Sequence, residues 1–121
     1  MSERPRVKAR AKVRVASGHL NKGEAAYAAH LEAMRRADLI DSWAFEPGSL
    51  RLADRTHYHP DFRVVLPDGL IEFHEVKGRK GDGPYIKEDA WVKLKAIAAI
   101  HPFVFVVVWP LKGGGWGRRE V

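Results

Sequence analysis

The amino-acid sequence predicts an α/β protein in which helices pack against a mixed central sheet. Three observations predict this class. Residues 21–40 have helical periodicity, residues 67–69 (PDG) form a turn between two strand-like segments, and residues 103–109 (FVFVVVW) are apolar without interruption. The order of helix, strands with an antiparallel hairpin, helix and strand is that of a layered α+β domain.

The first predicted helix begins after a polar residue suited to an N-cap. Asn21 is that residue, and Glu24 stands three positions later, where a glutamate completes a capping box. One face of the helix is apolar because residues at i, i+4 and i+7 are apolar, namely Tyr27, Leu31 and Met34.

Short strands are expected in the middle of the chain. The segments are 43–46, 50–53, 57–66 and 70–77, with turns at 47–49 and 67–69. Residues 78–83 (GRKGDG) are predicted to be an irregular loop because they are polar and glycine-rich. A second helix is expected over about 85–100, and the apolar run that follows suits a strand buried on both faces.

Charge and organisation suggest the class of partner. The 121 residues include 21 Lys and Arg against 15 Asp and Glu, a net charge of +6, which favours a polyanion such as nucleic acid. The absence of cysteine excludes disulfides, thiolate zinc sites and cysteine nucleophiles. We expect a basic arm at 1–16, one domain at 17–110 and a flexible, glycine-rich basic tail at 111–121.

No membrane partner is expected from the sequence. No apolar run reaches the ~18–20 residues that span a bilayer, and no signal-type segment follows the basic N-terminus. We therefore expect a cytoplasmic protein.

Three charged residues on the predicted hairpin point to metal-assisted chemistry. Asp61 lies on one strand, and Glu75 and Lys77 lie on the other, where alternation places them on one face. Two carboxylates can hold Mg²⁺ while leaving positions for water and phosphate, and a nearby lysine can orient the water. This residue set suits phosphodiester hydrolysis.

The two segments HPDF and EVK resemble the PD-(D/E)XK nuclease signature, and the chain is similar in organisation to small phage-borne proteins that resemble phage Holliday-junction resolvases. The resemblance implies a restriction-endonuclease-like core in residues 17–110 and a Mg²⁺-dependent endonuclease acting on duplex or branched DNA, with Mn²⁺ as a substitute. It implies that Asp61, Glu75 and the Val76 carbonyl bind the metal and that Lys77 handles the attacking water. It also implies a homodimer.

Two interpretations of Glu24 stay open: a metal ligand on the first helix, as in many members of that superfamily, or only a capping residue. Glu32 is the alternative helix carboxylate. A zinc site at His57 and His59 is a weaker interpretation, because His74 is expected to face away from Glu75.

Basic residues are expected to contact DNA phosphates in three places. They lie in the loop after the EVK segment, around the second helix and in the N-terminal arm: Arg79, Lys80, Lys87, Lys93, Arg10, Lys12 and Arg14. The same residues also suit a non-catalytic nucleic-acid-binding module, in which the acidic residues form only ion pairs. A structural or assembly protein is a third interpretation. Mg²⁺-dependent cleavage separates the enzyme from both.

Overall fold

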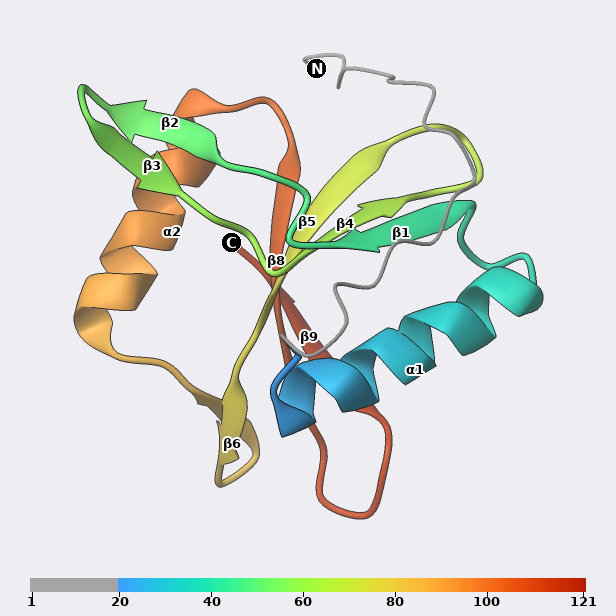
Figure 1. Ribbon diagram of the computed structural model, residues 1–121. Helices are drawn as coiled ribbons and strands as arrows, with labels where there is room; N and C mark the ends of the chain where they lie inside the picture. The colour runs from blue at the N-terminus through green and yellow to red at the C-terminus, as the bar shows by residue number, and fades with distance from the viewer. Residues whose placement is uncertain (1–19) are drawn as a thin grey trace.

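A five-stranded mixed sheet forms the centre of the computed structural model, which describes residues 20–121 (Figure 1). The order across the sheet is β1 (Ser42–Phe45), β4 (Phe62–Val65), β5 (Ile71–Val76), β8 (Val104–Pro110) and β9 (Trp116–Glu120). All neighbours are antiparallel except β5 and β8, which are parallel. The predicted α+β class, with a mixed sheet and an antiparallel hairpin, is thereby confirmed.

Helix α1 (Lys22–Arg36) covers one face of this sheet. Its first turn has the predicted capping box, and its buried residues Tyr27 and Leu31 belong to one hydrophobic core with Val106 and Val108 of β8. The basic arm expected before this helix, with Arg10, Lys12 and Arg14, lies outside the described residues.

Helix α2 (Glu88–Ile100) covers the opposite face, as Figure 1 shows. Its residues Leu94 and Ile97 are buried with Phe105 and Val107 of β8. Because successive residues of a strand point to opposite faces, β8 contributes to both cores, which explains its unbroken apolar sequence. The helix also provides the crossover that parallel pairing of β5 and β8 requires.

The segment predicted as one strand at 57–66 is instead two strands. The strand β3 (Thr56–Tyr58) pairs with β2 (Leu50–Ala53) in a separate hairpin, and β4 begins only at Phe62. Pro60 lies in the break, where a residue without a backbone N–H is tolerated. As a result, His57 and Asp61 do not share one continuous strand.

Residues 78–83 are also more regular than predicted. The strands β6 (Gly78–Lys80) and β7 (Gly83–Tyr85) form a short antiparallel hairpin. Gly81 has a φ of 63°, a left-handed conformation that glycine adopts without strain, and this allows the tight reversal. The prediction of an irregular loop was therefore wrong.

The predicted flexible tail is wrong as well, because β9 pairs with β8 over its whole length. Three consecutive glycines, Gly113 to Gly115, have positive φ and reverse the chain between the two strands. Trp116 then packs edge-on against Tyr27 of α1, with ring centroids 4.8 Å apart. Tertiary pairing therefore orders a segment whose composition predicts flexibility.

Candidate metal and phosphodiester site

Asp61 immediately precedes β4, and two hydrogen bonds fix its position. The backbone N–H of Val76 donates to Asp61 Oδ2 at 2.8 Å, and the N–H of Glu46 donates to the Asp61 carbonyl at 2.8 Å. The carboxylate thus accepts the Val76 N–H, which a backbone carbonyl would accept if β4 began earlier in the chain. Its orientation is set by the start of the hairpin.

Glu75 of β5 directly precedes Val76, whose N–H holds the Asp61 carboxylate. The register pairs Phe62 with His74, the chain neighbours of Asp61 and Glu75. The structure therefore brings the two predicted carboxylates together on the α2 side of the sheet.

Two further groups contact the Glu75 carboxylate. The Lys77 ammonium Nζ lies 3.2 Å from Oε2, and the Tyr58 hydroxyl donates to Oε1 at 2.6 Å. Burial and the charge of Glu75 raise the pKa of Tyr58 well above that of a free phenol, so the hydroxyl keeps its proton and remains a donor. Tyr58 is a site residue that the sequence analysis missed.

Electrostatic crowding is concentrated on Asp61. Burial and the charge of Glu75 raise its pKa from 3.8 to about 7, and the charge of Glu24 adds to this effect. The Val76 N–H and the Lys77 charge act in the opposite direction. Two carboxylates close together in a partly desolvated place are the donor set that a hard divalent cation prefers.

The Val76 carbonyl is placed to join these oxygens. In an extended strand the N–H and C=O of one residue point to the same side. Since the Val76 N–H donates to Asp61, the Val76 carbonyl also points to the Asp61 side of β5. Asp61, Glu75 and this carbonyl would be the protein ligands of a Mg²⁺ ion.

Glu24 caps helix α1, as one of its two interpretations predicts. Its Oε1 accepts the Asn21 N–H at 3.0 Å, and Asn21 Oδ1 accepts the Glu24 N–H at 2.7 Å. The first turn of α1 also approaches β5, because a Cβ on Gly23 would lie 3.9 Å from Val76 Cγ1. Glu24 therefore acts on Asp61 through its charge, while its carboxylate also caps the helix.

Glu32, the alternative helix carboxylate, is used elsewhere. It accepts hydrogen bonds from Arg35, Arg36 and the Trp43 indole N–H. These hydrogen bonds, with that from Arg35 the strongest, outweigh desolvation and lower the pKa of Glu32 to about 2.

The histidines of the zinc interpretation are not gathered. His57 is exposed on β3, whereas His74 is buried on the α1 face of β5. Within residues 20–121, no group of three or more His, Asp or Glu side chains has the spacing of a metal cluster. Any metal site here rests on the Asp61–Glu75 pair with backbone and water ligands.

One of the predicted phosphate-binding residues lies in a hollow beside this pair. A surface hollow of about 380 Å³ borders Asp61, and another of about 220 Å³ borders Glu75; His59 lines both. Lys93 of α2 lines the second hollow. The others lie beyond the hollows: Arg79 and Lys80 are exposed on β6, and Lys87 is the N-cap residue of α2.

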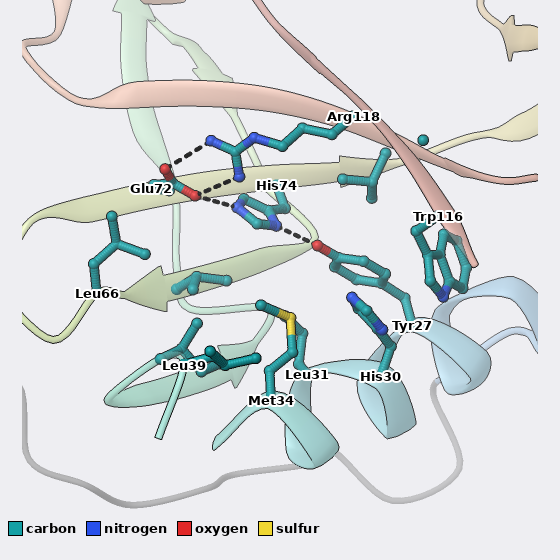
Figure 2. A pocket seen from close by; sticks show the side chains of 14 residues that line it. Tyr27, His30, Leu31, Met34, Leu39, Leu66, Glu72, His74, Trp116 and Arg118 are labelled. Carbon is teal, nitrogen blue, oxygen red and sulfur yellow. Dashed lines mark hydrogen bonds and ion pairs between the residues drawn. The ribbon is translucent and has the colours of Figure 1, made fainter. Parts of the chain in front are cut away.

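A second polar cluster on the α1 face was not foreseen (Figure 2). Arg118 of β9 donates two hydrogen bonds to Glu72, His74 Nε2 lies 2.8 Å from Glu72 Oε1, and the Tyr27 hydroxyl lies 2.6 Å from His74 Nδ1. Because a carboxylate only accepts, His74 Nε2 carries the proton and Nδ1 accepts from Tyr27. This chain of hydrogen bonds joins α1, β5 and β9 beside a cavity of about 170 Å³.

Burial and hydrogen bonding set the charges of this cluster. Burial alone would raise the pKa of Glu72, but hydrogen bonds from His74 and Arg118 outweigh it and lower that pKa to about 2. Burial lowers the pKa of His74, which stays neutral near pH 7. In the sequence, the only signal for this cluster is strand alternation, which predicts that His74 faces away from Glu75.

Comparison with known proteins adds no relative: no protein-family model matches the chain, and neither the curated proteins nor the solved structures gave a significant match. None of the described helices is long and apolar enough to cross a bilayer.

Proposed function

We propose that this protein is a Mg²⁺-dependent deoxyribonuclease that hydrolyses DNA phosphodiester bonds, with a core of the restriction-endonuclease type. One observation carries the proposal: Asp61, just before β4, accepts the N–H of Val76, the residue after Glu75 on β5, and the Lys77 ammonium lies 3.2 Å from Glu75. Strand geometry brings together two oxygen ligands and one amine, the groups that this chemistry requires.

Each residue has a role that follows from its contacts. Asp61 and Glu75 would hold the cation with the Val76 carbonyl, while the Val76 N–H and the Tyr58 hydroxyl keep the two carboxylates in place. When bound, Mg²⁺ or Mn²⁺ neutralises phosphoryl charge and makes a bound water more acidic. Lys77 orients the attacking water, because its ammonium lies beside a ligand carboxylate.

The surrounding charge suits a DNA substrate. The chain has a net charge of +6, Lys93 lines the hollow beside Glu75, and Arg79 and Lys80 are exposed on the strand that follows Lys77. Cations that contact phosphate oxygens position nucleic acid without reading its sequence. Duplex or branched DNA, a homodimer and a cytoplasmic location belong to the same proposal.

A Mg²⁺-dependent cleavage assay tests this function. Four-way junction, flap and linear duplex DNA are incubated with the protein and Mg²⁺, Mn²⁺ or EDTA. We expect cleavage only with metal, its loss in Asp61→Asn, and retention in Asp54→Asn, whose side chain is 88% exposed in the β2–β3 turn. Equal cleavage by the parent and Asp61→Asn would show that another site, or a contaminant, cuts the DNA.

A non-catalytic DNA-binding module is the second candidate, and the Lys77–Glu75 ion pair favours it, because that contact already offsets one carboxylate charge. Lys77→Ala separates the two functions. If the protein is a nuclease, the Lys77→Ala variant loses most of the cleavage rate but keeps its metal affinity. The binding module has no cleavage to lose and binds DNA equally well with and without Mg²⁺.

A further inference from the structure

The β6–β7 hairpin begins one residue after Lys77 and projects from the end of the sheet (Figure 1). Its register pairs Gly78 with Tyr85, Arg79 with Pro84 and Lys80 with Gly83. Paired Cα atoms are about 5 Å apart, and consecutive Cα atoms about 3.8 Å. The Tyr85 backbone therefore lies within about 9 Å of the Lys77 backbone.

Tyr85 is the exposed aromatic residue of this hairpin, with 52% of its surface accessible. Its cross-strand partner is Gly78, which has no side chain to cover the ring. A tyrosine in a buried core is usually well covered and hydrogen-bonded, and this ring is mostly open to solvent. Packing within the domain therefore does not account for its position.

Cations accompany the ring. Lys80 Nζ lies 5.6 Å from the Tyr85 ring centroid, Lys87 follows two residues after the ring, and Arg79 is exposed on the other face of the same hairpin. Aromatic rings among cations are the usual means of holding single-stranded nucleic acid, since the ring stacks on a base and the cations contact phosphates. Bases inside a continuous duplex are already stacked on each other.

Building on the proposed function, we propose that Tyr85 stacks on an unpaired base of the DNA that is bound at the Asp61–Glu75 site. The hairpin thereby gives the enzyme a preference for DNA with unpaired bases, at branches or single-stranded segments, over continuous duplex. Arg79 and Lys80 hold the adjacent phosphates irrespective of sequence.

Binding without cleavage tests this inference. Fluorescence anisotropy with the full chain in EDTA compares a short labelled single strand with a duplex of equal length. Tyr85→Ala is expected to weaken single-strand binding by roughly 5- to 150-fold, the equivalent of about 1–3 kcal/mol for one stacked base. Duplex binding is expected to change less than about twofold, because its phosphate contacts remain.

Matched variants separate stacking from other effects. Tyr85→Phe keeps the ring and is expected to bind like the parent, and so is Val92→Ala, which shortens a side chain 58% exposed on α2. Equal weakening of single strand and duplex by Tyr85→Ala, or no weakening of either, overturns the inference, as does a parent that does not bind single strands. If Tyr85→Ala selectively loses single-strand binding but the protein cleaves no DNA, stacking is supported and only the proposed nuclease activity is rejected.

Discussion

Neutralising Asp61 is expected to stabilise the metal-free protein, and the effect is expected to grow with pH. Burial and the Glu75 charge raise the pKa of Asp61 from 3.8 to about 7, so the folded state binds its proton more tightly than the unfolded chain. A carboxyl group whose pKa is higher in the folded than in the unfolded state destabilises the fold once it loses its proton. The penalty is small below pH 4 and is complete above pH 7.

The magnitude follows from the shift. About three pKa units at about 1.4 kcal/mol each give on the order of 4 kcal/mol at pH 8 and less than about 1 kcal/mol at pH 4. Asp61→Asn removes this penalty while keeping a carbonyl that accepts the Val76 N–H. The value is an upper bound, because an amide oxygen accepts this hydrogen bond less strongly than a carboxylate does.

Urea unfolding of the parent and Asp61→Asn in EDTA measures this difference at both pH values. The variant is expected to be more stable at pH 8 and nearly equal at pH 4. Excess Mg²⁺ at pH 8 is expected to stabilise the parent and not the variant. Asp54→Asn should change stability by less than about 0.5 kcal/mol. A variant less stable at pH 8, or a gap independent of pH, would refute the electrostatic argument.

Three other variants test separate contacts. Tyr58→Phe removes the hydroxyl that donates to Glu75 and should weaken Mg²⁺ binding about 10-fold by calorimetry, with little change in fold. Gly117→Ala should lower the free energy of unfolding by about 1–3 kcal/mol, because a Cβ there would overlap the Trp109 indole; unchanged stability would mean that β9 shifts freely. Arg118→Met should lower the free energy of unfolding by about 2–3 kcal/mol at pH 7, because the buried Glu72 carboxylate loses two hydrogen bonds. The loss should be much smaller at pH 2, where Glu72 is partly protonated.

Local signals predicted the helices and the central strands well. The capping box at Asn21 and Glu24, and the apolar run of β8, depend on residues close in sequence, and the structure has both. The segment β9 has no such signal, because WGRRE lacks an apolar alternation and follows three glycines. Its order comes from pairing with β8, which the sequence pattern does not show.

The candidate site was partly accessible to sequence reasoning for the same reason. Asp61 directly precedes β4, Glu75 lies on β5 and Lys77 directly follows it, so spacing and strand alternation place them together. Tyr58 reaches Glu75 only because the chain breaks at Pro60 and β3 folds separately over the α2 face. Glu72 and Arg118 are 46 residues apart, and no local pattern predicts their contact.

Binding of a divalent cation tests the central claim most directly. Isothermal titration calorimetry with Mg²⁺, and with Mn²⁺ as the tighter probe, compares the parent with Asp61→Asn, Glu75→Gln and Asp54→Asn. We expect the parent and Asp54→Asn to bind metal at a common site, and each of the other two variants to lose that binding. Equal metal binding by the parent and both carboxylate variants, or none by the parent, would contradict the claim that Asp61 and Glu75 together hold the ion.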